Sequence, residues 1–202
     1  TDICSVEQGA LIYRGYEIED LATHATFEEV AFLLLEGHKP SDDELKAYEA
    51  KLKADRRLPA AVADFLRTTP PMLNSGSAVP MDILRTAVSM LGNLDPQCQD
   101  NSPQAEKAKA ERLAAQIPTV IGHMQNALDG RDAVEPDDSL SHAANLLYMM
   151  TGKRPTEKAA RVMDVSLILY AEHDYNASTF TSRVSCATLS DLHSSVVGAI
   201  GA

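Results

Sequence analysis

Hydrophobic and polar residues recur along most of the chain with the three-to-four-residue spacing of amphipathic helices. Period-two alternation is confined to the first residues. Ile3 to Tyr16 holds the only plausible strand material, with Gly9 as a turn residue between two short apolar stretches. The pattern predicts an all-α, multi-helical single domain of eight to ten helices with a small N-terminal β-hairpin.

Capping residues set the expected helix boundaries. Thr26-x-x-Glu29 and Ser41-x-x-Glu44 are capping boxes that open helices over 27–36 and from 41 to about 57. Pro118 is expected to kink or split a long helix, because an interior proline costs about 3 kcal/mol. Residues 69–79 are expected to form a loop. The other helices are expected over 59–67, 80–91, 103–128, 139–150, 156–171, 176–188 and 191–202.

A polar cluster follows the most apolar helical stretch. Residues 162–171 are almost wholly apolar, which predicts a helix buried on nearly every side. It leads into Tyr170-Ala-Glu-His-Asp-Tyr-Asn-Ala-Ser-Thr-Phe-Thr-Ser-Arg183. Because buried polar groups need partners, this is where we expect a site. His173 is either a ligand contact or a core histidine, and Asn176, about one helical turn on, would donate a second hydrogen bond. Arg183 either meets an anionic ligand or forms a surface ion pair.

Charge and composition narrow the class of protein. The chain has 202 residues, 45% of them hydrophobic, and a formal net charge of −11. That charge argues against unaided binding to nucleic acid or to an anionic membrane. No secretory signal opens the chain and no apolar run reaches the roughly 20 residues of a membrane span, so a soluble, cytoplasmic protein is expected.

The remaining reactive residues predict no further chemistry. Three cysteines far apart in sequence offer no metal-ligand spacing, so no metal site is predicted. Charges over 106–112 predict a solvated helix face, and Ser178 and Thr179 are interpreted as helix caps rather than nucleophiles. Five histidines have no comparable cluster of polar residues beside them in the sequence and are not predicted to be functional, namely His24, His38, His123, His142 and His193. The residues alone support a helical domain with a polar pocket for a small molecule.

The stretch 167–183 closely resembles the histidine-bearing signature of the citrate synthase superfamily, and most of all that of bacterial 2-methylcitrate synthases. Further stretches agree in order along the chain, namely Tyr13-Arg-Gly-Tyr-Glu-Ile-Glu-Asp-Leu-Ala22, the segment that starts at Phe27, Pro80-Met-Asp-Ile-Leu-Arg-Thr-Ala-Val-Ser89 and Val197-Gly-Ala-Ile-Gly-Ala202. The resemblance therefore spans the whole chain.

The resemblance implies an acyltransferase that condenses propionyl-CoA or acetyl-CoA with oxaloacetate and hydrolyses the thioester, acting in propionate catabolism or the tricarboxylic acid cycle. It implies a homodimer that needs no cofactor, with acyl-CoA as a substrate. By position, His173 would bind oxaloacetate with Asn176 beside it. The apolar segments 139–150 and 196–202 would pack either at a dimer interface or within the subunit.

The resemblance also implies that part of the enzyme is absent. In the family, a Gly-Pro-x-His-Gly-Gly segment follows the position of Ala202, and another histidine, an aspartate base and carboxylate-binding arginines come later. Residues 1–202 are thus expected to be the N-terminal part of the large domain, with no catalytic residue, completed by the remainder of the same polypeptide. This chain alone is expected to be inactive. The alternative is a stand-alone, non-catalytic helical module for binding or oligomerisation.

Overall fold

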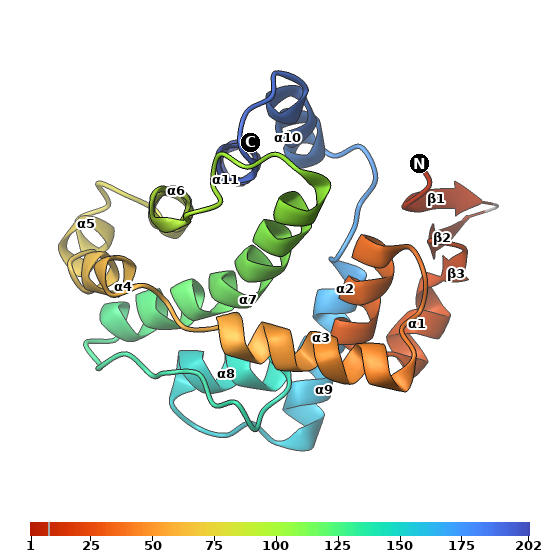
Figure 1. Ribbon diagram of the computed structural model, residues 1–202. Helices are drawn as coiled ribbons and strands as arrows, with labels where there is room; N and C mark the ends of the chain where they lie inside the picture. The colour runs from red at the N-terminus through yellow and green to blue at the C-terminus, as the bar shows by residue number, and fades with distance from the viewer. Residues whose placement is uncertain (8) are drawn as a thin grey trace.

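The computed structural model describes residues 1–7 and 9–202 and opens with a small antiparallel sheet (Figure 1). Strands β1 (Cys4–Glu7), β2 (Ala10–Tyr13) and β3 (Tyr16–Glu17) lie in the order β1-β2-β3, and Cys4 is paired with Tyr13. The predicted hairpin is confirmed, and the two-residue β3 is an addition that the sequence pattern did not predict.

The rest of the described chain is helical, as predicted. The helices are α1 (Ile18–His24), α2 (Phe27–Glu36), α3 (Asp42–Asp55), α4 (Ala60–Arg67), α5 (Pro70–Asn74), α6 (Pro80–Leu94), α7 (Pro103–Leu128), α8 (His142–Thr151), α9 (Glu157–Leu169), α10 (Ala177–Ala187) and α11 (Leu192–Ile200). In the described parts of the chain, no helix combines the length and apolar character needed to cross a membrane.

Several predicted boundaries were wrong for local reasons. Helix α5 lies inside the expected loop 69–79, where two consecutive prolines occupy the first helical turn and lose no needed N–H. Helix α6 continues past Gly92, which faces His193 at close range instead of ending the helix. Helix α8 is capped by Ser141, not by Ser139, and α1 was not predicted at all.

Helix α7 is the axis of the fold. Of the two outcomes expected at Pro118, a kink or a split, the split does not occur, because the helix runs unbroken for 26 residues. Figure 1 shows it crossing the molecule with α3, α4, α6 and α8 against it, and α11 also touches it. The largest core cluster forms where α4, α6 and α7 meet, and it contains Val62, Val88, Leu113 and Val120.

Helix α9 is less buried than its sequence predicts. Only Asp164 and Ile168 are buried in it, whereas Val162 is 60% exposed and Leu169 is 46% exposed. Asp164, the polar break in the apolar run, accepts a hydrogen bond from the Phe27 backbone N–H at 2.9 Å and so joins α9 to the start of α2. The prediction of burial on nearly every side is therefore wrong, because one apolar face of α9 is uncovered.

Candidate functional site

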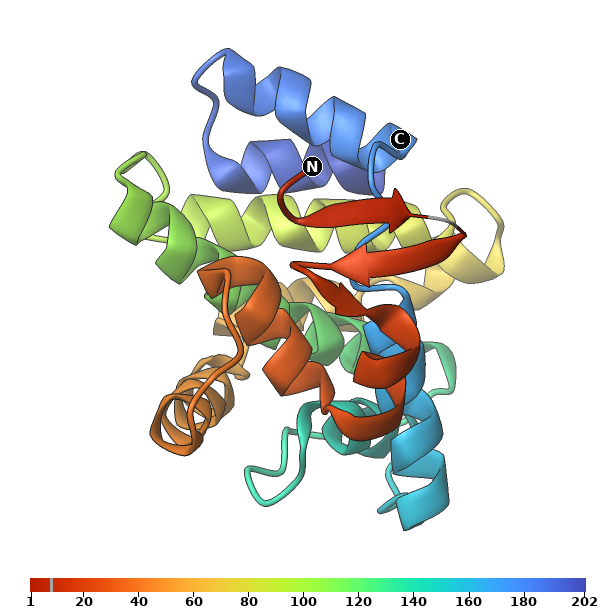
Figure 2. The same cartoon turned by 90° about the vertical axis from the view of Figure 1, so that its right-hand side faces the viewer.

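The predicted site residues lie on the short connection between α9 and α10. Residues 170–176 form this connection, and Figure 2 shows it passing behind the N-terminal sheet. His173 lies exposed on it, and Asn176 is half-buried at its end. The structure thus places both predicted residues on one non-helical segment, three positions apart. His173 has no hydrogen-bond partner within the described parts of the chain, so its ring nitrogens are free to meet a ligand.

Tyr13 holds this connection against the sheet. Its side chain is fully buried, and its hydroxyl donates to the Glu172 carbonyl oxygen at 2.8 Å. The Glu172 backbone N–H donates in turn to the same hydroxyl at 3.3 Å. One side chain therefore satisfies both backbone groups of the residue before His173. This role of Tyr13 was not predictable from the sequence, because a strand residue carries no local signal of a partner 159 positions away.

Carboxylates flank His173 on both sides. The Glu172 side chain accepts a hydrogen bond from the Asp174 backbone N–H at 2.6 Å. Asp174 has a left-handed backbone with φ of 55°, a conformation that is uncommon outside glycine and asparagine or aspartate. Its Oδ1 atom is buried and has no hydrogen-bond partner among the described residues. The turn is therefore fixed on the Glu172 side and has one unused acceptor on the Asp174 side.

Cys4 packs beneath these carboxylates. Burial, followed by a hydrogen bond and electrostatic repulsion from Glu172 and Asp174, raises the pKa of the Cys4 thiol to about 11. A thiol that stays protonated at neutral pH donates to a carboxylate instead of acting as a nucleophile. Cys4 thus supports the connection from the sheet side.

Helix α10 begins directly at the site. The Asn176 side-chain oxygen caps it by accepting the Thr179 backbone N–H at 2.7 Å, which leaves the Asn176 amide NH₂ free to donate. The helix N-terminus adds partial positive charge next to His173. Arg183 on α10 stacks its guanidinium 5.2 Å from the centre of the Tyr175 ring. Its described contact is thus a cation–π contact and not the expected surface ion pair.

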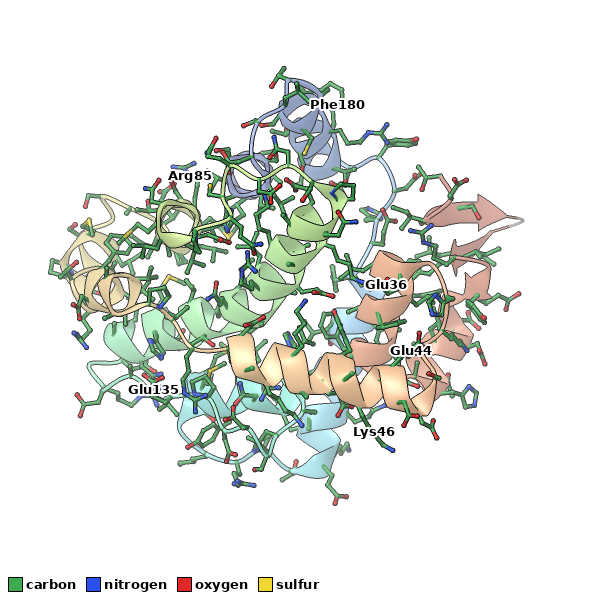
Figure 3. The ribbon with its side chains drawn as sticks, viewed as in Figure 1. Glu36, Glu44, Lys46, Arg85, Glu135 and Phe180 are labelled. Atoms are coloured by element: carbon green, nitrogen blue, oxygen red, sulfur yellow. The ribbon has the colours of Figure 1, made fainter. Side chains whose placement is uncertain are left out.

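Apolar side chains around the site are unusually exposed. Tyr170 is 89% exposed and Tyr175 is 62% exposed on the connection itself, and Phe180 points outward from α10 in Figure 3. An apolar hollow of about 380 Å³ lies between α2, α7 and α9, with Tyr170 and Ala171 on its edge. Large exposed apolar side chains beside an apolar hollow are typical of a place where another protein segment or a ligand binds.

A family model and curated relatives match this chain along its whole length. The model described as "Citrate synthase, C-terminal domain" matches residues 1–202. The chain belongs to the citrate synthase family. It is 47% identical to the 2-methylcitrate synthase of Shewanella oneidensis and 43% identical to the citrate synthase of Deinococcus radiodurans. These alignments cover 97% and 96% of the chain but 50% of each relative, so the chain spans about half the length of the curated relatives it matches.

Solved structures give the same result. The citrate synthase of Pyrobaculum aerophilum superimposes with a TM-score of 0.92 at 38% identity, over all of this chain and 52% of that one. The citrate synthase of Thermoplasma acidophilum, solved in a ternary complex with carboxymethyl coenzyme A and oxaloacetate, gives a TM-score of 0.91 at 25% identity, again over 52% of its length. The predicted multi-helical citrate synthase fold is confirmed.

The contribution of Tyr13 to the site can be measured with Tyr13→Phe. The loss of the hydroxyl leaves both Glu172 backbone groups unpaired, so we expect the free energy of unfolding to fall by about 1–3 kcal/mol. Amide hydrogen exchange should also accelerate over residues 170–176. Tyr16→Phe is the matched control, because its partly exposed ring keeps its contact with Lys39 when the hydroxyl is removed. Equal stability and exchange in the two variants would show that the Tyr13 hydroxyl does not hold the connection.

The raised pKa of Cys4 predicts slow thiol alkylation. At pH 8 a thiol with a pKa of about 11 is ionised to roughly one part in a thousand, so its rate should rise about tenfold per pH unit until the pH approaches 11. We expect exposed Cys186 to react far faster than Cys4 in the folded protein, as mapped by peptide mass spectrometry, and this difference to disappear in urea. Similar rates for the two cysteines before unfolding would contradict the described environment of Cys4.

Proposed function

We propose that this chain supplies the His173 side of the oxaloacetate site of a 2-methylcitrate synthase, an enzyme that converts propionyl-CoA, oxaloacetate and water into 2-methylcitrate and CoA. Acetyl-CoA would be an alternative substrate, which would give citrate. The observation that supports this best is the placement of His173. It is exposed, has no hydrogen-bond partner among the described residues, and lies on a connection fixed by Tyr13 at the N-terminus of α10.

The chemistry of the connection suits a dicarboxylate. A histidine N–H, the free Asn176 amide and the positive end of α10 are all donors or partial positive charges, which favour carboxylate oxygens. The carboxylates of Glu172 and Asp174 would repel a bound anion, but the Glu172 carboxylate already accepts a hydrogen bond from a backbone N–H of the same turn. The relative from Thermoplasma acidophilum, which was solved with oxaloacetate, has the same fold over this region.

One histidine and one amide do not complete such a site. Oxaloacetate is a dianion, and its binding needs several converging cations. Removal of a proton from the carbon next to a thioester needs a positioned carboxylate base and hydrogen bonds to the developing enolate. By the resemblance, these groups lie in segments that would follow Ala202. We therefore propose that the remainder of the same polypeptide completes the site and covers the exposed apolar face around Tyr175 and Phe180.

Residues 1–202 would then form the N-terminal part of the large helical domain, in a cytoplasmic homodimer that uses acyl-CoA as substrate and needs no further cofactor. The relatives include both citrate synthases and 2-methylcitrate synthases, so an assay is needed to identify which acyl-CoA is the preferred substrate. A direct comparison of kcat/KM for propionyl-CoA and acetyl-CoA would identify it.

The 202-residue chain by itself is expected to release no CoA from propionyl-CoA or acetyl-CoA in the presence of oxaloacetate. The physical reason is that, by the resemblance, the base for the α-proton and the cations for the second carboxylate lie in segments that would follow Ala202. The measurement is CoA release by the purified chain, followed with a thiol reagent after correction for the protein's own cysteines. Clear turnover would contradict the proposal.

In the protein that includes the Gly-Pro-x-His-Gly-Gly segment, His173→Ala should lower kcat/KM for oxaloacetate about 100-fold, as the loss of a charge-assisted hydrogen bond of about 3 kcal/mol predicts.

Asn176→Asp in the same protein keeps the oxygen that caps α10 but removes the amide donor, so it should raise the KM for oxaloacetate without changing the unfolding midpoint. His24→Ala is the control, because His24 is also exposed but lies in α1. If the His173 and His24 variants had equal kinetics, His173 would not bind the substrate.

A further inference from the structure

Three potential metal ligands from distant parts of the chain meet at the start of α11. Cys98 lies in the connection between α6 and α7, and Asp191 and His193 lie at the first turn of α11. One ligand atom from each residue lies within 4.8 Å of the other two. Cys98 and Asp191 are 93 positions apart in sequence, which is why sequence spacing alone predicted no metal site.

One ring nitrogen of His193 is available to bind a metal ion. His193 is 3% exposed, and its Nδ1 atom is buried with no hydrogen-bond partner among the described residues. Its Nε2 atom lies 3.7 Å from Asp95 Oδ2. A buried polar atom without a partner costs about 1–3 kcal/mol. The Asp95 carboxylate is thus near the Nε2 side of the ring but beyond hydrogen-bond distance, and Nδ1 is the ring nitrogen left for a metal ion.

Close helix packing brings His193 to this position. A Cβ atom at Gly92 of α6 would lie 2.7 Å from the Cβ of His193, so only glycine permits this approach of α6 and α11. The absence of a side chain at Gly92 is what places the His193 ring beside the connection that holds Cys98. Gly92, which the sequence pattern suggested as a helix stop, thus has a packing role.

The two basic side chains near the three ligands, Lys109 and Arg112, are already bound to other groups. Lys109 is fully buried, and its ammonium group already donates to the carbonyls of Cys98 and Asp100 and to the Glu106 carboxylate, at 2.8–3.1 Å. Its burial corrects the expectation of a solvated face over 106–112.

Arg112 is likewise engaged, since it binds the Asp95 carboxylate at 2.7 Å. Lys109 and Arg112 are thus paired with Glu106 and Asp95, whereas the Asp191 carboxylate forms no ion pair among the described residues.

We propose that Cys98 Sγ, His193 Nδ1 and an Asp191 carboxylate oxygen bind one Zn²⁺, with water at the fourth position. Cysteine sulfur, histidine nitrogen and carboxylate oxygen are the ligand types that zinc uses. Neighbouring ligand atoms in a tetrahedral zinc site lie about 3.3–3.8 Å apart, so the three atoms need to approach by no more than about 1.5 Å. Binding releases the Cys98 thiol proton to solvent and forms the zinc–sulfur bond.

Such a site would add to the contacts between two segments that the Asn101 side chain already joins by a hydrogen bond to the Leu189 carbonyl oxygen at 3.3 Å. The ion would fasten the connection between α6 and α7 to the start of α11, the helix on which α10 packs. A ligand that binds only the folded state stabilises it, so zinc should raise the unfolding temperature of the protein.

The test is zinc protection of cysteines from alkylation in the wild-type, metal-stripped protein. We expect micromolar ZnCl₂ to slow alkylation of Cys98 at least tenfold while Cys186 is unaffected, with both sites mapped by peptide mass spectrometry. Cys186 is the internal control, because it is exposed and its thiol contacts Ser195 instead of the cluster. Equal protection of the two cysteines, or no protection of Cys98, would overturn the proposal.

A matched variant separates zinc binding from folding. Asp191 caps α11 by accepting the Ser194 backbone N–H at 2.9 Å, and asparagine is an equally good cap. The second carboxylate oxygen accepts from the Ser194 hydroxyl at 2.7 Å, and an asparagine amide at that position would donate to the same hydroxyl. Asp191→Asn should therefore leave the zinc-free protein folded but weaken zinc binding at least tenfold, measured by competition with a chromophoric chelator. Cys186→Ser should bind zinc like the wild type. Zinc affinity that is unchanged in Asp191→Asn would contradict the assigned ligand set.

Discussion

The fold depends on helix α7 remaining continuous through Pro118. Proline lacks the N–H that would bond to the carbonyl of Ala114, and an interior proline costs about 3 kcal/mol of helix stability. Packing offsets this cost, because Leu113, Val120 and Met124 are buried against α4 and α6, and each such side chain contributes about 1.5–3 kcal/mol. Gly122 lets α8 approach so closely that a Cβ atom there would lie 2.6 Å from that of Met149. A broken α7 would separate the helices that surround it.

The candidate site lies away from this axis and depends on a second long-range contact. The connection that holds His173 is joined to the N-terminal sheet through the Tyr13 hydroxyl and supported from below by Cys4. Tyr170 and Tyr175 on the connection and Phe180 on α10 are exposed. A connection that is ordered on one face and apolar on the other is suited to be one wall of a site that another segment closes. This arrangement is consistent with a chain that spans about half the length of its curated relatives.

Local features of the fold were predictable from the sequence, because their causes are local. The capping boxes at Thr26 and Ser41 placed the starts of α2 and α3, and Asn176 was correctly placed at the start of α10. The all-α class followed from helical periodicity and short connections. The residues 172–176 were singled out as a site because they combine several hydrogen-bonding side chains in one short stretch.

Features that depend on distant residues were not predictable. The apolar run in α9 predicted burial, but the covering of a helix face is decided by segments elsewhere, and here one face is uncovered. The bond from Tyr13 to Glu172 and the meeting of Cys98 with His193 join residues that are more than 90 positions apart. Gly92 looked like a helix stop because its role, a close approach to α11, has no local signature.

The central claim is that His173 belongs to an oxaloacetate site that a following segment of the same polypeptide completes. Intact mass spectrometry of the protein from its natural source tests this claim most directly. A mass near twice 21.8 kDa, or a second fragment that begins close to a glycine-histidine motif, is the predicted result. A single species of 21.8 kDa with no second fragment would contradict the claim and would favour a stand-alone helical module.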